Sequence, residues 1–385
     1  MINKHFILHL TLLENIGPAT IQPIIQRSDV SASDLYLFSA SDWMHTFGFT
    51  SVTAEKLAEG LCNKKVLDDE LVLIERNNIQ WATVEEDSYP QLLREIYLPP
   101  SVLYWQGQTD FSDMKKSLSI VGARKADTYG YRVVNALIPD LVAAQYTIVS
   151  GGARGIDTMA HEATIKNGGK TIAVLGSGLL HLYPAGNMRF FKSIVDHGGA
   201  VVSSFPLLME PLPGHFPARN RIITGLSRGC LVVQAAKKSG ALISAHYAME
   251  QGREVFAAPG PFDDELSAGC NALIQSGAKL VTSVSDILQE FGDRIVLTDK
   301  NVTEQKAVQL SLESAVVKKS DVVESVHYND VQKKIIAACK EQSSLDDIVI
   351  RTQLTSEAVQ SELFNLQLDG VIEQDFTGMW IALRS

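Results

Sequence analysis

Cysteine is scarce in this sequence and never paired in a motif. The four cysteines, Cys62, Cys230, Cys270 and Cys339, are scattered through 385 residues, and no two of them form a Cys-x-x-Cys pair. Such spacing supports neither a disulfide framework nor a zinc site, and it is typical of proteins of a reducing compartment. We therefore expect no metal centre.

Long hydrophobic runs are missing as well. The stretch Phe6-Ile-Leu-His-Leu-Thr-Leu-Leu13 is too short and too polar to span a bilayer, and no small-residue cleavage site follows it. With 45% apolar and 20% charged residues, the composition is that of a globular chain long enough for two or three domains. We expect a cytoplasmic protein with no membrane partner.

An excess of positive charge is also absent, since the net charge is −10. Its distribution is uneven: residues 115–290 hold 17 basic and 13 acidic side chains, and the rest of the chain holds 17 basic and 31 acidic ones. A mildly basic middle is what an anionic polymer would need, although a balance of +4 is also common in neutral enzymes.

The familiar catalytic motifs are missing. The sequence has no G-x-S-x-G elbow, no H-E-x-x-H and no close carboxylate pair, and its nine histidines are dispersed. A dinucleotide fingerprint would need glycine where Ser150 stands and an acidic residue at the end of the next strand, so we expect neither NAD nor another cofactor. His161 and His246 lie in helical stretches and are interpreted as packed or surface residues. We find no nucleophile with its base, and we expect no enzyme.

A glycine-rich turn is the most distinctive feature that is present. A β-branched run over 147–149 ends at Gly151-Gly152, and a helix-compatible segment follows from about 156 to 165. Glycines let a ligand approach the backbone closely, and the N–H groups of a helix's first turn favour an anion. The segment therefore predicts a phosphate cradle.

The middle of the chain alternates between apolar strands and helix-length segments. This pattern predicts a parallel sheet covered on both faces, in a doubly wound α/β domain whose ligand lies beyond the carboxyl ends of the strands. The expected strands are 117–121, 147–149, 171–175, 199–202, 231–233, 254–257 and 279–281.

The flanks have a different character. Residues 10–63 read as short helices, and Ile16-Gly17-Pro18 resembles half of a helix-hairpin-helix, with a plain helical packing domain as the favoured interpretation. We read 65–102 as a connector that leads into the sheet. The predicted boundaries are a helical domain of the SAM or helix-hairpin-helix type over 1–75, a Rossmann-like core over 76–290, a linker over 291–328 and a winged-helix-like domain over 329–385.

The C-terminal pattern predicts three helices, 329–341, 344–352 and 356–369, and two strands, 371–375 and 379–383. The third helix contains no Lys or Arg and three acidic residues. Because a recognition helix that faces phosphates is expected to be basic, we predict that this module contacts a protein or the rest of the chain and does not read duplex DNA.

Basic and small polar residues gather after the predicted strands. Arginine fits a phosphate with two hydrogen bonds, and glycine and hydroxyl side chains complete a binding surface. The alternative is that some of these arginines pair with Asp157, Glu162 or carbonyl groups inside the sheet. Phe216, Tyr183, Tyr129 and Phe262 are candidates for stacking bases, or equally for the core.

The sequence contains, in this order, the motifs Ser150-Gly-Gly-Ala-Arg-Gly-Ile-Asp157, Thr171-Ile-Ala-Val-Leu-Gly-Ser-Gly178, Phe216-Pro-Ala-Arg-Asn-Arg-Ile-Ile223, Ser239-Gly-Ala-Leu-Ile-Ser-Ala245, Ala258-Pro-Gly260 and Gly269-Cys-Asn271. These motifs resemble the successive signatures of the DNA-processing protein A (DprA/Smf) family. The resemblance implies an extended Rossmann-like domain that binds single-stranded DNA and forms a homodimer. It also implies that the protein protects incoming single strands and helps to load a RecA-type recombinase during natural transformation.

The resemblance also implies the binding residues. Arg124 matches the basic residue of the family's Gly-x-Arg turn, and Arg219-Asn220-Arg221 matches its Arg-Asn-Arg loop. The rival hypothesis is a nucleotide-binding hydrolase of the phosphoribohydrolase type, which would need Asp157 or Glu162 as its catalytic acid. The predicted nucleic-acid-binding residues are Gly122, Arg124, Ser150, Gly151, Gly152, Arg154, Gly155, Arg219, Asn220, Arg221, Lys237, Ser239, Gly240 and Asn271.

Overall fold

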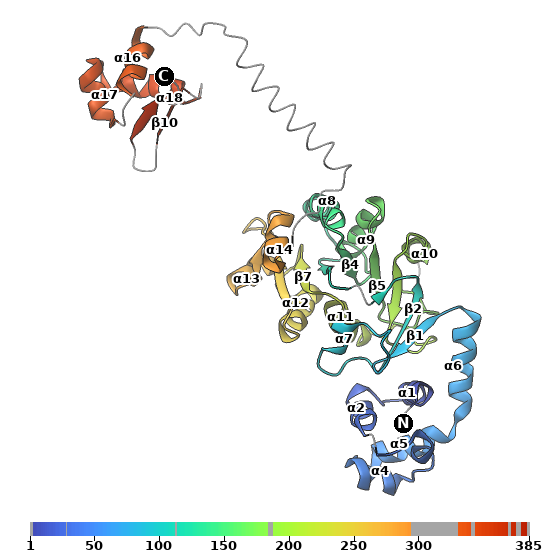
Figure 1. Ribbon diagram of the computed structural model, residues 1–385. Coiled ribbons are helices and arrows are strands. Elements are labelled where there is room, and N and C mark those ends of the chain that lie inside the picture. The colour runs from blue at the N-terminus through green and yellow to red at the C-terminus, as the bar shows by residue number, and fades with distance from the viewer. Residues whose placement is uncertain are drawn as a thin grey trace. The chain divides into compact units, whose positions relative to one another are not determined.

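The computed structural model describes residues 3–27, 29–111, 114–183, 188–293, 330–339, 343–368, 371–374 and 379–382. The chain divides into two compact units, Met1–Thr298 (unit 1) and Asp299–Ser385 (unit 2) (Figure 1). Most of the linker predicted over 291–328 lies outside the described residues. Within those residues, no helix is both long enough and apolar enough to cross a membrane.

Unit 1 is built on a sheet that has nine strands in the described residues, in the order β1-β2-β6-β5-β4-β3-β7-β8-β9. Neighbouring strands from β6 through β9 pair in parallel, whereas β2 is antiparallel to both β6 and β1. The strands are β1 (Gln80–Thr83), β2 (Val102–Gly107), β3 (Ser117–Val121), β4 (Thr147–Ser150), β5 (Thr171–Val174), β6 (Ala200–Ser203), β7 (Gly229–Val232), β8 (Glu254–Ala257) and β9 (Lys279–Leu280). The predicted doubly wound, mostly parallel α/β fold is confirmed, and each predicted strand is found within two residues of its expected ends.

Helices cover both faces of this sheet (Figure 1). The helices of unit 1 in the described residues are α1 (Lys4–Thr11), α2 (Pro18–Gln26), α3 (Ala32–Leu35), α4 (Ala40–Phe47), α5 (Ser51–Cys62), α6 (Lys64–Arg76), α7 (Gln91–Arg94), α8 (Thr128–Ala143), α9 (Ile156–Lys166), α10 (Met188–Asp196), α11 (His215–Gly225), α12 (Gly240–Glu250), α13 (Ala268–Gln275) and α14 (Val284–Phe291). Helices α7, α11, α12 and α13 share one hydrophobic cluster, and α8, α9 and α14 share another.

Successive side chains of a strand point to opposite faces of the sheet. In β5, Ile172 and Val174 belong to the cluster of α11 and α12, whereas Ala173 packs with α10 and the N-terminal helices. All three side chains are fully buried. A strand that is buried on both faces reads as a continuous apolar run, which is why these strands were recognisable in the sequence.

The N-terminal helices form as predicted. Helix α2 begins with Pro18 directly after Gly17, and the Ser31 side chain caps α3 in a capping box. These helices share a hydrophobic cluster with β2, β5 and β6, and the buried Glu70 carboxylate of α6 accepts the N–H of Leu207 at 2.9 Å. The boundary predicted at residue 75 lies in the last turn of α6, and the helix-hairpin-helix resemblance stays a prediction.

The interpretation of 65–102 as a connector is wrong. This stretch forms helix α6, edge strand β1 and the short helix α7. Strand β1 pairs antiparallel with β2, so that Gln80 lies opposite Trp105. Strand β1 lies at the edge of the sheet and is only four residues long, with polar Gln80 and Thr83 at its ends, so it gave no continuous apolar run in the sequence.

Unit 2 has the predicted pattern of helices and strands. Helices α16 (Asp330–Ala338), α17 (Leu345–Thr352) and α18 (Ser356–Leu368) are followed by β10 (Ile372–Gln374) and β11 (Trp380–Ala382), which pair antiparallel. The Ser344 side chain caps α17 in a capping box, and a separate hydrophobic cluster holds the three helices and both strands together. The turn predicted at 377–378 lies outside the described residues.

Candidate functional site

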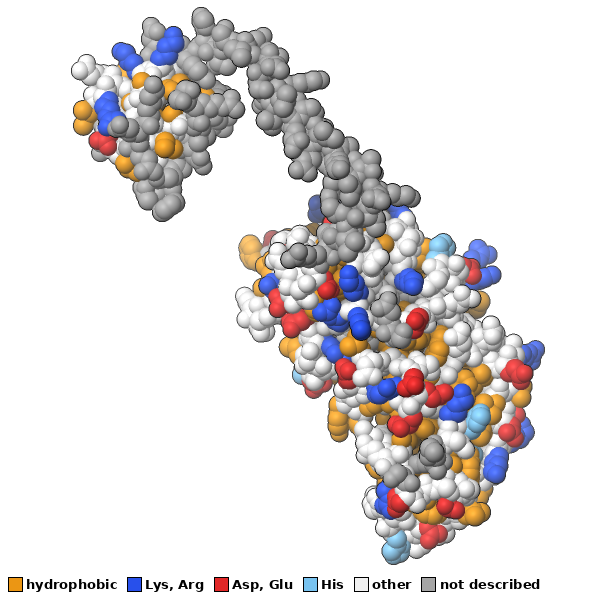
Figure 2. All heavy atoms as spheres, viewed as in Figure 1, with side chains coloured by type: hydrophobic (Ala, Val, Ile, Leu, Met, Phe, Trp, Pro, Cys, Tyr) orange, Lys and Arg blue, Asp and Glu red, His pale blue; other side chains and the backbone are white. Residues whose placement is uncertain are grey.

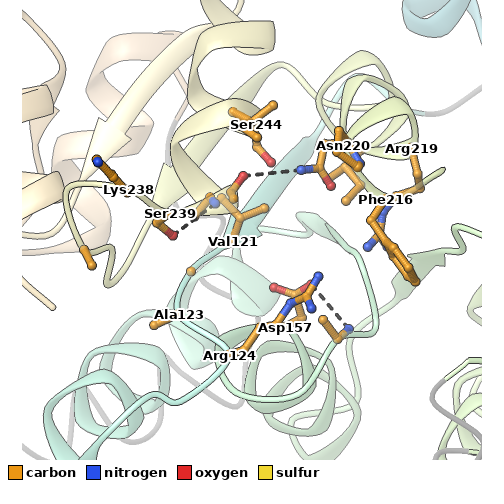
Figure 3. A pocket seen from close by; sticks show the side chains of 18 of the residues that line it. Val121, Ala123, Arg124, Asp157, Phe216, Arg219, Asn220, Lys238, Ser239 and Ser244 are labelled. Carbon is orange, nitrogen blue, oxygen red and sulfur yellow. Dashed lines mark hydrogen bonds between the residues drawn. The ribbon is translucent and has the colours of Figure 1, made fainter. Parts of the chain in front are cut away.

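A pocket of about 650 Å³ opens at the carboxyl ends of β3, β4 and β7 (Figure 3). The chain continues from β3 through β4, β5 and β6 on one side of the sheet and returns to pair β7 with the other side of β3. A crevice at such a switch point is the general ligand site of doubly wound sheets. The pocket is lined by Val121–Lys125, Ala153, Asp157, Pro213, Phe216, Pro217, Arg219, Asn220, Ile223, Ala236, Lys238–Ala241, Ile243, Ser244 and Leu266.

The rim of the pocket is basic and partly aromatic. Arg124, Lys125 and Lys238 line it and are exposed. The Arg124 guanidinium lies 5.7 Å from the centre of the ring of Phe216, a residue of α11. The centre of the Tyr183 ring lies 5.4 Å from the centre of the same Phe216 ring. Cations and ring faces that share one rim suit a ligand with both phosphates and bases.

Two helices begin at the pocket. Helix α11 begins at His215 with no side-chain cap, and α12 begins at Gly240, where the Ser239 hydroxyl accepts the N–H of Ala241 at 3.2 Å. The Asn220 amide donates to the Gly240 carbonyl at 3.3 Å and so joins the two helices (Figure 3). Helix N-termini favour an anion, which adds to the charge of the rim.

The structure corrects the prediction of an open phosphate cradle after β4. The Asp157 carboxylate accepts the N–H groups of Gly151 at 3.1 Å and Ala153 at 3.4 Å, and the N–H of Ile156 donates to the Ala123 carbonyl at 3.2 Å. The amides predicted to hold a phosphate thus bind groups of the protein itself. Asp157 is buried, and burial raises its pKa to about 6 against the opposing effect of Arg219.

Arg219 forms part of the floor of the pocket and does not reach into solvent. Its exposed fraction is 4%, and one guanidinium nitrogen donates to the carbonyls of Gly151 and Val174. Burial lowers the pKa of Arg219 to about 10, against the opposing effect of Asp157. Its Nε is buried and has no hydrogen-bond partner among the described residues. Arg219 therefore holds the turn after β4 in place and adds positive charge beneath the pocket.

Other predicted side chains also serve the scaffold. The Ser150 hydroxyl is buried and donates to the Ile120 carbonyl. The Asn271 side-chain amide accepts the N–H of Gly260 through its oxygen and donates to the Gly260 carbonyl through its nitrogen. Arg221 donates to the carbonyls of Tyr97 and Leu98. The sequence left open that some arginines pair with acidic side chains or with carbonyls inside the sheet. Arg219 does so through the Val174 carbonyl of β5, whereas the partners of Arg221 lie in the segment between α7 and β2.

The predicted residues fall into two groups. Those that line the pocket are Gly122, Arg124, Arg219, Asn220, Ser239 and Gly240, and those that do not are Ser150, Gly151, Gly152, Arg154, Gly155, Arg221, Lys237 and Asn271. Arg154 and Lys237 are exposed outside the lining. The list of predicted residues omits Lys125 and Lys238, although each directly follows a residue of that list.

Among the candidate aromatic residues, Phe216 lines the pocket. The Tyr129 hydroxyl donates to the Pro259 carbonyl, whereas the Phe262 side chain is 94% exposed and lies outside the lining. On the face that Figure 2 shows, basic and acidic side chains of unit 1 are interspersed, so the charge of the pocket itself is the relevant quantity.

Groups for metal or acid–base chemistry are sparse in the part of the chain that the structure describes. No cluster of three or more His, Cys, Asp or Glu side chains occurs there. His161 is buried, with Nδ1 2.6 Å from the Thr171 hydroxyl, and burial lowers its pKa to about 3. The expectation that His161 is a packed residue is confirmed, and Asp157 is the one carboxylate among the described residues that line the pocket.

Comparison with known proteins gives a consistent picture. The family model described as DNA recombination-mediator protein A matches residues 80–292. Protein Smf of Synechocystis sp. is 37% identical over 317 residues, which cover 78% of this chain and 79% of that protein. DNA processing protein DprA of Streptococcus pneumoniae is 47% identical over 209 residues, which cover 54% of this chain and 73% of that protein.

The fold comparison agrees with the sequence comparisons. The X-ray structure of DNA processing protein A from Streptococcus pneumoniae superimposes with a TM-score of 0.65 at 35% identity. The superposition covers 75% of this chain and 99% of that chain.

Proposed function

Because this chain belongs to the DNA recombination-mediator protein A family, we propose that it binds single-stranded DNA at the pocket of unit 1 and passes the coated strand to a RecA-type recombinase. The protein acts in the cytoplasm as a homodimer that protects incoming strands during natural transformation. It performs this role without cutting the strand.

One observation carries the proposal. Three exposed cations, Arg124, Lys125 and Lys238, surround a pocket at the switch point of the sheet, while Asp157 lies buried beneath them. A groove with this charge holds a phosphate backbone through contacts that carry no sequence information. The ring of Phe216 at the same rim supplies a surface on which any base can stack.

The test is a titration with oligo-dT. Arg124→Ala should weaken binding about tenfold or more at moderate salt and reduce the salt slope of the affinity by about one, because one phosphate contact is lost. The fold should be unaffected, since Arg124 is exposed and makes no hydrogen bond or ion pair within the described residues.

The control is Arg76→Ala, which removes an exposed arginine from the end of α6, a helix that contributes nothing to the pocket lining. Its affinity for oligo-dT should match that of the wild type. Equal affinities for Arg124→Ala and Arg76→Ala would reject the pocket as the DNA site.

A nucleotide hydrolase is the second candidate, and the raised pKa of Asp157 in the pocket is the observation that favours it. Against it, the Asp157 carboxylate already accepts two backbone N–H groups, from Gly151 and Ala153. Release of base from nucleoside monophosphates by the purified protein, lost in Asp157→Asn, would establish the hydrolase.

A further inference from the structure

Tyr97 is an exposed aromatic residue in a segment whose other parts are anchored. Its side chain is 84% exposed, although the preceding residue, Ile96, is 5% exposed and Pro100 is buried. The segment joins α7 to β2.

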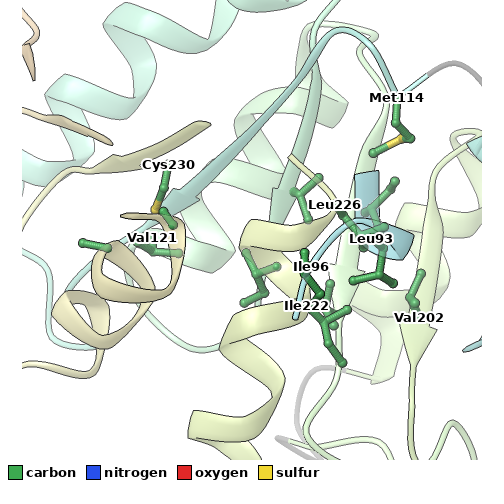
Figure 4. Close-up of a cluster of buried hydrophobic side chains, with 14 of the residues drawn as sticks. Leu93, Ile96, Met114, Val121, Val202, Ile222, Leu226 and Cys230 are labelled. Atoms are coloured by element: carbon green, nitrogen blue, oxygen red, sulfur yellow. The ribbon is translucent and has the colours of Figure 1, made fainter. Parts of the chain in front are cut away.

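Core packing fixes the segment on its inner side. Leu93 and Ile96 lie against Ile222 of α11 and against Leu226, the residue that follows this helix (Figure 4). A Cβ atom added at Gly225 would approach Leu93 to 2.8 Å and Ile96 to 3.1 Å, so this glycine is what allows the segment to lie so close to α11.

Hydrogen bonds fix the segment from both ends. The Tyr89 hydroxyl donates to the Pro100 carbonyl at 2.8 Å, and Arg253 donates to the Leu92 carbonyl at 2.7 Å. Arg221 holds the carbonyls of Tyr97 and Leu98. These contacts fix the backbone of the segment, while the Tyr97 side chain stays exposed.

The backbone at Leu98 is in the left-handed region, with φ of +49°. A leucine rarely adopts this conformation, because its Cβ crowds the following carbonyl group. Strained conformations that the surrounding structure holds in place occur preferentially at functional sites. Here the strained residue directly follows the exposed Tyr97.

The segment adjoins the pocket through α11. Asn220 of α11 lines the pocket, and the next residue, Arg221, donates a hydrogen bond to the Tyr97 carbonyl. The Arg221 side chain therefore connects the backbone of Tyr97 to the helix that borders the pocket. The charges here also suit a polyanion. Arg221 and Arg253 lie under the segment, and the one exposed carboxylate beside Tyr97 in the chain, that of Glu95, lies 3.8 Å from Arg253, which offsets its charge.

Phe262 provides the contrast. It is 94% exposed, but Asp263 and Glu265 beside it are exposed carboxylates that repel a phosphate backbone. Exposure alone therefore does not distinguish the two rings, whereas the surrounding charge does.

We propose that Tyr97 stacks on a base of the single strand whose phosphates occupy the pocket, at the point where the strand leaves it over Asn220. This inference rests on the proposed function. Because every base has a flat face, the contact increases affinity without selecting a sequence. It also makes the site longer than the pocket alone.

The experiment compares oligo-dT of about 4 and about 16 nucleotides, which span the usual range of single-strand sites. Tyr97→Ala should weaken binding of the longer strand roughly 5- to 150-fold, the value of one stacked base, and leave the shorter strand's binding unchanged. Tyr97→Phe should retain wild-type affinity. Leu37→Ala, which removes an 85% exposed side chain in the N-terminal helices, is the control for loss of apolar surface.

Strands with abasic sites separate stacking from other roles. On an abasic strand, wild type and Tyr97→Ala should bind equally, because only phosphates remain. If Tyr97→Ala weakens binding of the abasic strand as much as binding of the strand with bases, the residue acts through the fold, and the proposal is overturned. If it leaves every strand's affinity unchanged, the ring serves a protein partner or nothing, and the proposal is likewise overturned.

The two proposals fail differently. Loss of short-strand binding in Arg124→Ala supports the pocket independently of Tyr97. If Arg124→Ala has this effect and Tyr97→Ala has none on the longer strand, only the stacking proposal is rejected. If Arg124→Ala binds the short strand as the wild type does, the proposed function itself is rejected.

Discussion

At the scale of single residues, identical side chains have opposite tasks. Arg124 is exposed at the rim of the pocket, Arg219 is buried beneath it and Arg221 is turned to backbone carbonyls outside it. A Cβ atom added at Gly151 would lie 2.5 Å from Arg219 and 2.6 Å from Asp157, so the two charged groups flank this glycine closely. The positive charges of Arg124 at the rim and Arg219 beneath it add to each other, and the negative charge of the Asp157 carboxylate cancels part of their sum.

We expect Asp157 to make the affinity for oligo-dT depend on pH. Its pKa of about 6 means that the carboxyl group is neutral below that pH and ionised above it. Neutralisation removes a negative charge from the floor of the pocket, so we expect the affinity for oligo-dT to increase about fivefold between pH 7 and pH 5, or ~1 kcal/mol.

The variant that isolates this effect is Asp157→Asn. Its amide oxygen can still accept the N–H of Gly151, but its charge is absent at every pH. Fluorescence titrations across the same pH range should give a flatter profile for Asp157→Asn than for the wild type. Parallel profiles would assign the pH dependence to other groups.

At the scale of elements, the turn between β4 and α9 is the tightest connection around the pocket. Gly155 precedes α9 with φ of +82°, and a Cβ atom there would lie 2.2 Å from the Ala123 carbonyl oxygen. This contact joins the loop after β4 to the loop after β3, which carries Arg124. The geometry of the rim therefore depends on a glycine that does not itself line the pocket.

Gly155→Ala should be strongly destabilising. The matched control is Gly168→Ala, because Gly168 also has a positive φ, +72°, but has open space where a Cβ would lie. We expect Gly168→Ala to lower the free energy of unfolding by about 1–2 kcal/mol and Gly155→Ala by about 2 kcal/mol more, since only the latter adds a clash with backbone. Urea unfolding followed by circular dichroism measures both, and equal losses would show that the turn relaxes freely.

At the scale of the whole molecule, the two units have separate hydrophobic clusters. Unit 2 packs its three helices and two strands around residues such as Ile335, Leu363 and Trp380. Among the described side chains of unit 2, that of Arg351 donates to the Ala338 carbonyl and the Ser343 hydroxyl, so it stabilises its own unit. Helix α18 contains no basic residue.

We therefore expect fragment 326–385 to fold alone and to leave duplex DNA unshifted in a gel at moderate salt. Fragment 1–298 should bind oligo-dT within about twofold of the full chain, because the pocket lies wholly within unit 1. Tight binding of duplex DNA by fragment 326–385 would contradict this assignment.

The sequence by itself predicted the parallel strands from β3 to β9 and the order of helices and strands in unit 2. Strands β3 and β8 have the ends predicted for them, and α18 begins at the predicted Ser356, because the hydrophobic period acts between residues close in the chain. It did not reveal β1 and β2, the two antiparallel strands at one edge of the sheet, and β1 is short and lacks a continuous apolar run. The motifs also sufficed to indicate the family.

Only the tertiary structure decided which charged residues face the pocket. Arg219 meets the carbonyl of Gly151, 68 positions earlier, and Arg221 meets Tyr97, 124 positions earlier. Neither contact follows from the local pattern Arg-Asn-Arg, because the rotation of α11 on the sheet sets where each side chain points. The same packing exposes Tyr97, a residue that no local signal marked, beside the strand ends that the sequence had correctly identified.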